Sequence, residues 1–418
     1  MERAELARRL GAVAMAAGAA RRPAATVIGE AQPARFMPAF ARAVAGSGPV
    51  FVTDPARAGG PCVALDEHVR EGGGEAERGW LMIPSGGTGG GVKFARHDGE
   101  TLAAAVGGFC AHFGLARVNA VGVLPLHHVS GLMAWMRCAL TGGVFLPWNW
   151  GDLKEGRRPE LATREPWVLS LVPTQLQRLL ERPEAVAWLR RFEIVFVGGG
   201  PVWPELVEAA ARADLPLALS YGMTETAAMV TALRPGEFRA GGRSSGTALP
   251  HARVTVTADG VVEVAGAAVC RGYYPEWSGV GAFRTEDLGV LDAEGRLTVL
   301  GRRDAIINTG GEKVRPEEVE QALRASGEFA DVAVIGVPDA EWGQAVVACY
   351  PTGEQLPDFA RAAAALTGPR RPKRYVAITD WPRNAQGKLN RAELRVLAAA
   401  AGGIPPGEGQ GPGGAPPR

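Results

Sequence analysis

The sequence predicts an α/β protein with a large N-terminal domain of mostly parallel sheets covered by helices, an antiparallel β subdomain attached to it, and a small α+β C-terminal domain. Three observations support this prediction. At 418 residues, the chain exceeds what one hydrophobic core usually supports. Strand-like runs alternate with helical patterns up to about residue 240, as in parallel sheets covered by helices. Beyond that point, turn dipeptides separate β-branched runs, which indicates hairpins.

The α/β part can be divided into elements from its apolar runs. Short runs at 25–28 and 50–52 alternate with Gly/Pro-rich breaks, a pattern compatible with βα units. A glycine-rich segment then precedes a helix expected at 101–113. Further strands are expected at 120–124, 168–172, 193–197 and 215–219, and a helix at 204–213.

The β subdomain and the C-terminal domain follow. Asp259-Gly260 and Glu294-Gly295 lie between strand-like runs and predict hairpin turns, so that 240–303 forms the β subdomain of an N-terminal domain over 1–303. A C-terminal domain over 304–400 is a reasonable size for a small domain. Its expected elements are a helix at 316–325, strands at 332–337 and 345–350, a helix at 358–366 and a strand at 375–379. The Gly/Pro-rich tail over 401–418 is expected to be disordered.

Composition excludes several classes of protein. A net charge of +1 argues against a general nucleic-acid binder. Five dispersed cysteines without a CxxC pair fit a reducing cytosol and no cysteine-based metal site. No stretch approaches the ~18 apolar residues of a membrane span. The run 10–20 is Ala-rich, but Glu2 and Glu5 precede it, which favours a surface helix over a signal peptide. We therefore expect a cytoplasmic protein; the sequence carries no signal for its oligomeric state.

A glycine-rich segment is the first candidate binding site. Consecutive glycines let backbone N–H groups point at phosphate oxygens, hydroxyls add donors, and a lysine adds charge. The order of the residues fits neither a Walker A loop nor GxGxxG, which disfavours a P-loop NTPase and a Rossmann dehydrogenase. Taken alone, this segment could instead be a flexible surface loop. The segment consists of Ser85, Gly86, Gly87, Thr88, Gly89, Gly90, Gly91, Val92, Lys93.

A second segment follows a predicted strand directly and reads Tyr221-Gly222-Met223-Thr224-Glu225-Thr226. Together with the glycine-rich loop, it resembles the adenylate-forming superfamily, which includes acyl-CoA synthetases, aryl-CoA ligases, luciferases and peptide-synthetase adenylation domains. The second motif matches without departure. In the first, Gly89 stands in place of a hydroxyl residue and Val92 in place of proline, so a more mobile loop is expected. Taken in isolation, the second segment could be a strand-ending turn.

The resemblance implies an ATP site around these motifs. Tyr221 would offer a flat face to adenine, Thr224 a hydroxyl to the α-phosphate, and Glu225 a carboxylate oxygen to Mg²⁺. Asp287 would bind both ribose hydroxyls, and Arg302 would contact ribose or phosphate. Taken alone, Asp287 or Arg302 could instead belong to a solvated cluster of charges beside a hairpin. The loop that resembles the adenine-flanking loop of the family reads Gly198, Gly199, Gly200, Pro201.

The C-terminal part resembles the mobile domain of the same family. Asp304 matches the hinge position about which that domain swings. Lys388 matches the lysine that bridges the substrate carboxylate and the α-phosphate, where an ammonium would stabilise charge as two anions are brought together. An exposed surface lysine is the alternative for any Gly-Lys step. The loop that would enter the active site for the thioester step contains Gly310, Gly311, Glu312, Lys313.

The segment from Pro125 to Leu132 gives the resemblance to one particular group within the family. It is similar to a segment of the o-succinylbenzoate–CoA ligases of menaquinone and phylloquinone synthesis. His128 and Ser130 would contact the acid, and Arg137 could face an extra substrate carboxylate. A hydrogen-bonded buried histidine is the alternative for His128.

The resemblance implies a ligase that joins o-succinylbenzoate to CoA with ATP and Mg²⁺. Three alternatives stay open: another aryl- or fatty-acyl-CoA ligase, an adenylase that loads a carrier protein, and a degenerate, non-enzymatic sensor of nucleotide or acyl groups.

Overall fold

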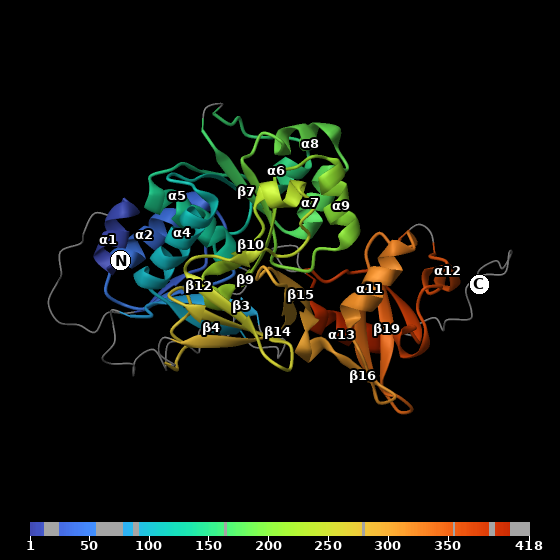
Figure 1. The fold of residues 1–418 in the computed structure, drawn as a ribbon. Coiled ribbons are helices and arrows are strands. Elements are labelled where there is room, and N and C mark those ends of the chain that lie inside the picture. The colour runs from blue at the N-terminus through green and yellow to red at the C-terminus, as the bar shows by residue number, and fades with distance from the viewer. Residues whose placement is uncertain are drawn as a thin grey trace.

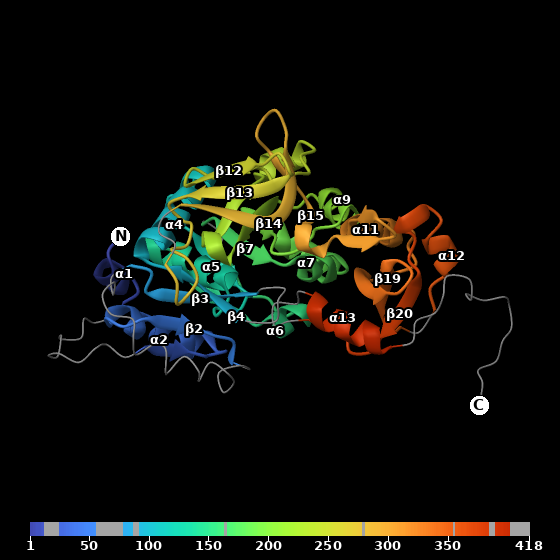
Figure 2. The same ribbon diagram turned by 90° about the horizontal axis from the view of Figure 1, so that it is seen from below.

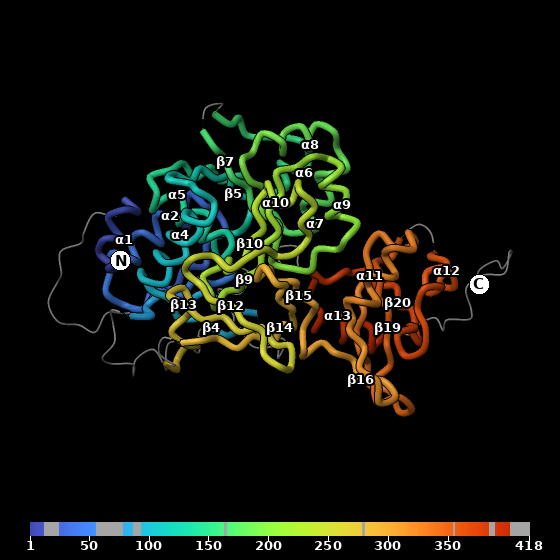
Figure 3. The backbone as a smooth tube through the Cα atoms, viewed as in Figure 1, coloured from blue at the N-terminus to red at the C-terminus, as the bar shows by residue number. Residues whose placement is uncertain are grey.

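The computed structural model describes residues 1–11, 25–55, 78–86, 92–162, 165–277, 281–353, 356–383 and 389–401. Its elements gather in two groups (Figure 1). Everything up to β15 lies at one end of the molecule, and the elements from β16 onward lie at the other. The backbone trace in Figure 3 passes from β15 into the second group.

The first sheet has the order β1-β2-β3-β4, with β1, β2 and β3 parallel and β4 antiparallel to β3. Because parallel strands end at a common edge, the carboxyl end of β3 brings Ser85 to that edge. Two helices bury Leu6, Phe36 and Phe40 against this part of the core. The elements are α1 (Arg3–Arg9), β1 (Thr26–Ile28), α2 (Pro33–Ala45), β2 (Val50–Val52), β3 (Leu81–Gly86) and β4 (Val92–His97).

The second sheet has the order β11-β10-β9-β8-β7-β5-β6 and is parallel from β9 to β6. Alternate residues of its strands face opposite helical layers. In β8, Val195 and Val197 pack with α7, α8 and α9, whereas Ile194 and Phe196 pack with α4 and α5. The strands are β5 (Asn119–Gly122), β6 (Phe145–Pro147), β7 (Trp167–Leu171), β8 (Ile194–Val197), β9 (Leu217–Met223), β10 (Ala228–Ala232) and β11 (Thr247–Ala248).

Helices cover this sheet because it is apolar on both faces. Asp98 starts the first of them by accepting hydrogen bonds from the backbone N–H groups of Glu100 and Thr101, so the helix begins two residues before the predicted start. The helices are α4 (Gly99–Phe113), α5 (Val129–Thr141), α6 (Trp150–Lys154), α7 (Pro173–Leu180), α8 (Pro183–Leu189), α9 (Pro204–Arg212) and α10 (Pro235–Arg239).

The predicted β subdomain is confirmed as an antiparallel sheet in the order β12-β13-β14-β15. Both predicted hairpin turns are present, and the glycines in them, Gly260 and Gly295, have φ of 79° and 75°, values that favour glycine. The strands are β12 (Ala252–Val256), β13 (Val261–Gly266), β14 (Ala282–Leu291) and β15 (Leu297–Arg302).

The C-terminal group is a small α+β unit, seen from another side in Figure 2. Its sheet runs β17-β16-β19-β18, and β20 pairs with β19. One helix is shorter than predicted: after Ala363 the hydrogen bonds shift from the fourth to the third preceding residue, which ends regular α-helix. The elements are β16 (Ile307–Thr309), β17 (Glu312–Val314), α11 (Pro316–Ala325), β18 (Ala333–Asp339), β19 (Gly343–Pro351), α12 (Phe359–Ala362), β20 (Arg374–Ile378) and α13 (Arg391–Ala400).

The sheets and helices confirm the predicted fold class. The two groups touch where α11 meets the end of β15, and the guanidinium of Arg324 lies 5.2 Å from the Trp203 ring. Within the ranges that the structure covers, no helix is both long and apolar enough to span a bilayer. The predicted tail, and most of the predicted helix at 10–20, lie outside the described residues.

Candidate functional site

The segment Tyr221–Thr226 forms a tight turn where β9 ends and the chain reverses into β10. A 3₁₀ turn covers Thr224–Thr226, and Ala227 and Ala228 have φ of 49° and 82°, a conformation that side chains rarely adopt. The Thr226 hydroxyl fixes this turn: it accepts from the Met223 N–H (3.1 Å) and donates to the Ala228 carbonyl (2.7 Å). Gly222 is required, since a Cβ there would lie 1.9 Å from the Ala228 carbonyl oxygen.

Glu225 is buried at the centre of the site, with 6% of its surface exposed. Its Oε1 accepts hydrogen bonds from the Ser85 hydroxyl at 2.5 Å and from the Tyr273 hydroxyl at 2.6 Å. Thr224 lies against the same strand end, with its hydroxyl 3.4 Å from the Pro84 carbonyl oxygen. The structure therefore brings the predicted phosphate segment and the predicted metal ligand into direct contact.

His97 supports this turn from below the surface. It is fully buried, and its Nε2 lies 2.8 Å from the Thr224 carbonyl oxygen, while Nδ1 lies 3.1 Å from the Thr101 hydroxyl. Burial lowers the pKa of His97 to about 4, so the imidazole is neutral at pH 7. Because a carbonyl oxygen only accepts, Nε2 carries the proton and donates it to Thr224, and Nδ1 is left as an acceptor facing the Thr101 hydroxyl.

Tyr221, Asp287 and Arg302 lie together beside Glu225. The Tyr221 hydroxyl donates to Asp287 Oδ2 at 2.6 Å, and Arg302 is the direct partner of Asp287 across β14 and β15, with Nη1 3.8 Å from Oδ1. Burial raises the pKa of Asp287, although the Tyr221 hydrogen bond and the Arg302 charge oppose that effect. The pKa of Arg302 is raised, first by its hydrogen bonds to Asp304.

The adenine-flanking loop of the prediction follows β8 and is held against β9. Gly199 has φ of 75°, and a Cβ on Gly198 would lie 2.8 Å from the Ser220 carbonyl oxygen. The chain at Gly198 is therefore packed against Ser220, the residue that precedes Tyr221. Gly200 and Pro201 continue this loop toward α9, and a Cβ on Gly200 would meet no atom within 4 Å.

A magnesium ion would fit this site only in company with a substrate. In the described ranges, no group of three or more His, Cys, Asp or Glu side chains could hold a metal by itself. Mg²⁺ is commonly held by one or two carboxylates together with substrate phosphates. Glu225 offers one such carboxylate, and the described chain records no hydrogen bond to its Oε2.

The predicted acid-binding residues lie on α5 and at its N-terminus. His128 precedes the first helical residue, and Gly131 allows the helix to approach Pro125, whose carbonyl oxygen would lie 2.2 Å from a Cβ. Ser130 lies in the first turn. Arg137 is nine residues beyond His128, about 14 Å along the helix axis, so the structure does not place these two side by side.

Arg137 is buried, and none of the acidic residues in the described ranges forms an ion pair with it. It is 5% exposed, and its guanidinium lies 4.1 Å from the Phe109 ring. Among the residues that the structure describes, nothing hydrogen-bonds to its Nε or forms an ion pair with it. Buried arginines are normally paired with an anion. The Arg137 guanidinium is therefore suited to bind one.

The predicted thioester loop is a hairpin between β16 and β17. Gly310 and Gly311 form its two-residue turn with φ of 56° and 82°, as a type I′ turn requires. Glu312 and Lys313 are exposed on β17. Figure 1 shows the hairpin projecting from the C-terminal group on the side away from β3 and β9. The structure does not bring this loop together with Glu225.

Several predicted residues lie outside the described part of the chain: Gly87, Thr88, Gly89 and Lys388. The two ends of the Lys388 loop lie inside the described ranges. Arg383 and Leu389 form an isolated β-bridge across the loop, and the Asn390 N–H donates to the Pro382 carbonyl at 2.8 Å. Gly86 ends β3, and Lys93 pairs directly with Ser85 across β3 and β4. The Lys93 ammonium lies 5.4 Å from the Tyr273 ring.

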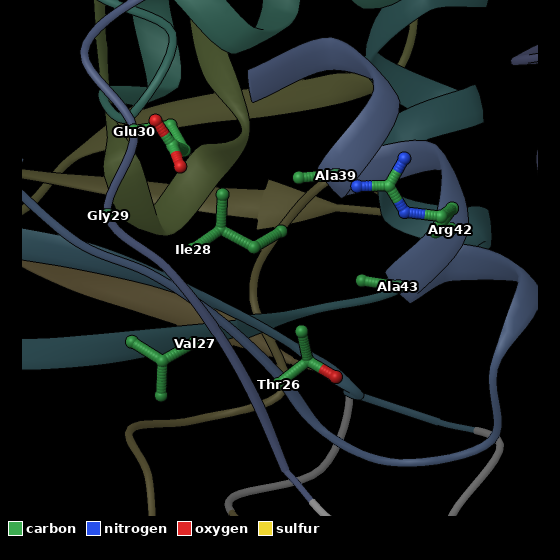
Figure 4. Close-up of a pocket in the computed structure, with 8 residues that line it drawn as sticks. All are labelled: Thr26, Val27, Ile28, Gly29, Glu30, Ala39, Arg42 and Ala43. Atoms are coloured by element: carbon green, nitrogen blue, oxygen red, sulfur yellow. The ribbon is translucent and has the colours of Figure 1, made fainter. Parts of the chain in front are cut away.

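Sequence reasoning missed Tyr273, which donates to Glu225 from 48 residues further along the chain. No local pattern marks it, since the aromatic pair Tyr273-Tyr274 before Pro275 also fits an ordinary turn. A cavity of 280 Å³ lies elsewhere, between β1 and α2, and none of the predicted site residues lines it. Figure 4 shows Glu30 and Arg42 on its opposite sides.

Comparisons with known proteins agree with this geometry. The sequence matches the AMP-binding enzyme family over residues 42–274 and the AMP-binding enzyme C-terminal domain over 318–388. A 2-succinylbenzoate–CoA ligase of Listeria monocytogenes serotype 4b is 34% identical over 65% of this chain, which spans only 60% of that protein's length. A probable 2-succinylbenzoate–CoA ligase of Mycobacterium tuberculosis H37Rv is 31% identical over 86% of this chain and 94% of its own length.

Solved structures lead to the same family. The o-succinylbenzoate CoA synthetase of Bacillus subtilis, in complex with its acyl-adenylate intermediate, has a TM-score of 0.65 at 27% identity, covering 79% of this chain and 73% of its own. ATP-bound MatB from Rhodopseudomonas palustris has a TM-score of 0.73 at 22% identity over 94% and 92%, which supports the fold alone. Since the first family match covers more than half of the 418 residues, the chain belongs to the AMP-binding enzyme family, as its motifs predicted.

Proposed function

We propose that this protein is an AMP-forming acid–CoA ligase that activates o-succinylbenzoate with ATP. The observation that carries the proposal is the convergence of Ser85, Tyr221, Glu225 and Asp287 from three separated segments on one site, with Glu225 buried at its centre. An ATP site needs hydroxyl and backbone donors for phosphate, a carboxylate for the metal ion and a carboxylate for ribose, and these side chains supply them.

The first half-reaction joins the acid to the α-phosphate and releases pyrophosphate. Tyr221 and the loop at Gly198 would hold adenine, and the Asp287 carboxylate would accept from the ribose hydroxyls after exchanging its bond to the Tyr221 hydroxyl. Mg²⁺ would be held by Glu225 and would neutralise phosphate charge. Lys388 would place an ammonium between the two anions that react, where it stabilises the transition state.

The second half-reaction would need a different arrangement of the C-terminal domain. Asp304 marks the proposed boundary between a domain over 1–303 and one over 304–400. In the structure, the Gly310-Gly311 hairpin lies away from Glu225, so it can contribute to thioester formation only after a rotation. The same rotation would withdraw Lys388.

The choice of acid rests on Arg137. o-Succinylbenzoate carries a second carboxylate, and a buried guanidinium without an acceptor is suited to bind it. The named relatives from Listeria and Mycobacterium agree with this choice. A fatty-acyl or simple aryl substrate would leave the guanidinium buried and unpaired, which is unfavourable.

The choice of CoA over a carrier protein rests on the surface beside the Gly310-Gly311 hairpin. Arg371 is exposed there, and the Lys373 ammonium lies 4.1 Å from the Trp342 ring, which itself packs on Gly310. Cations beside an aromatic face suit the phosphates and the base of a nucleotide.

The described cysteines are free thiols, in keeping with a cytoplasmic location.

An acid-dependent ATP–pyrophosphate exchange assay, followed by a thioester assay with CoA, tests the proposal. We expect exchange with o-succinylbenzoate and not with benzoate or a fatty acid, and thioester only when CoA is added. Arg137→Met should lose o-succinylbenzoate exchange, whereas Arg35→Met, an exposed arginine of α2, should not. Exchange with other acids alone would assign another ligase. Adenylate formation without transfer to CoA would favour the carrier-loading alternative, and no exchange with any acid would favour the sensor.

A further inference from the structure

Tyr273 shares one oxygen atom of Glu225 with Ser85. The two hydroxyls donate to Oε1 at 2.6 and 2.5 Å. A carboxylate that accepts two hydrogen bonds at one oxygen has its plane and its other oxygen fixed. Oε2 is then the atom of Glu225 that is directed to a ligand.

The two donors differ in how firmly they are held. Ser85 lies at the end of β3, where the phosphate segment begins, and ATP phosphates would compete for its hydroxyl. Tyr273 lies on the segment 270–274, which runs antiparallel to β4 through backbone hydrogen bonds of 2.8 to 2.9 Å. The Cys270 N–H also donates to the Glu225 carbonyl at 2.7 Å, so the phenol and the carboxylate are fixed to each other through the backbone.

A buried ion pair anchors the same segment. Arg271 donates to Asp98 at 2.9 Å, and both side chains are almost fully buried. The Tyr273 ring lies 5.4 Å from the Lys93 ammonium, a cation–π distance.

We propose that Tyr273 is a positioning residue of the nucleotide site: its hydroxyl orients Glu225 so that Oε2 faces the metal ion of Mg·ATP, and its ring orients Lys93 toward the phosphates. The proposal deepens the proposed function and rests on its ATP site, not on the identity of the acid. When ATP draws the Ser85 hydroxyl away, Tyr273 is the donor that keeps Glu225 in place.

Tyr273→Phe tests the role of the hydroxyl, since it keeps the ring beside Lys93. Binding of a non-hydrolysable ATP analogue is measured by calorimetry, once with Mg²⁺ and once with EDTA. We expect about a tenfold loss of affinity with Mg²⁺ and less than about a twofold change in EDTA, from the usual strength of a hydrogen bond to a charged group. Tyr274→Phe is the matched control, because its ring packs on Phe51 at 5.0 Å, and both of its affinities should equal those of the wild type.

A double-mutant cycle separates positioning from a general structural effect. In a Glu225→Gln background, Tyr273→Phe should cause no further loss of Mg²⁺-dependent affinity. Equal losses with Mg²⁺ and with EDTA, or a full effect in the Glu225→Gln background, would overturn the inference. The affinity in EDTA also reports whether the variant is folded. Absence of any nucleotide binding by the wild type would instead overturn the proposed function, and failure to use o-succinylbenzoate would leave this inference intact.

Discussion

Replacing Arg137 by methionine should stabilise the ligand-free protein while it removes binding of a second carboxylate. Burial lowers the pKa of Arg137 to about 10 from an ordinary value of about 12.5. At ~1.4 kcal/mol per pKa unit, this corresponds to a desolvation cost on the order of 3 kcal/mol. The contact with the Phe109 ring at 4.1 Å offsets part of it, about 1–2 kcal/mol. Methionine has a similar length and no charge, so a net gain of about 1–2 kcal/mol is expected.

Urea unfolding of the wild type and the variant measures this difference. Arg137→Lys is the control, since it keeps a buried charge and should give no gain in stability. A saturating acid adds a second measurement: at 100 times its dissociation constant, o-succinylbenzoate should stabilise the wild type by ~2.7 kcal/mol and should leave Arg137→Met unchanged. If Arg137→Met lost ~1 kcal/mol or more of stability, the guanidinium would have an acceptor in the folded protein, and the argument for a second carboxylate would fail.

Three further predictions concern the catalytic steps and the core. Lys388→Ala should abolish acid-dependent ATP–pyrophosphate exchange and spare thioester formation from supplied acyl-adenylate; equal loss of both half-reactions would contradict the rotation model. Gly310→Ala should impair thioester formation and spare ATP–pyrophosphate exchange, because a Cβ there meets the Trp342 ring at 2.8 Å in a turn with φ of 56°. Rapid-quench assays of each half-reaction measure this difference. The pKa of His97 is about 4 in the folded protein, below its unfolded value of about 6.5. The unfolded chain therefore takes up the proton first, and stability falls as the pH drops from about 6.5 toward 4. The free energy of unfolding, measured by urea titration, should therefore fall by about 1.4 kcal/mol per pH unit in this window, and His97→Gln should show a shallower dependence.

Local sequence patterns predicted several strands of the second sheet, among them β5, β7, β8 and β9, whereas β4, β6 and β10 were not predicted. The apolar run before Tyr221 predicted β9, and the glycines at the turns report backbone conformations that other residues avoid. The partner of Glu225 could not be predicted in this way. Periodicity reports which residues are buried, but the bond from Tyr273 depends on how a separate segment pairs with β4.

The same limit applies to Arg137. Its position on α5 could be predicted from sequence, whereas the absence of an acidic partner depends on α4, which brings Phe109 rather than a carboxylate against it. In the C-terminal part, the helix predicted over 358–366 was too long because alanine-rich sequence favours helix throughout, whereas the backbone after Ala363 bonds to the third preceding residue in a tighter turn.

The ion pairs around Arg302 limit where a rotation can begin. Arg303 donates two hydrogen bonds of 3.0 and 2.9 Å to Glu286 of β14, which connect this residue to the antiparallel sheet. Arg302 donates to the Asp304 carboxylate at 2.8 and 2.7 Å and lies 3.8 Å from Asp287. A rotation that starts at Asp304 would pull its carboxylate away from Arg302 and leave the guanidinium to the ribose or phosphate beside Asp287. Nucleotide contact and domain orientation would then compete for one side chain, which would connect the proposed hinge directly to the proposed ATP site.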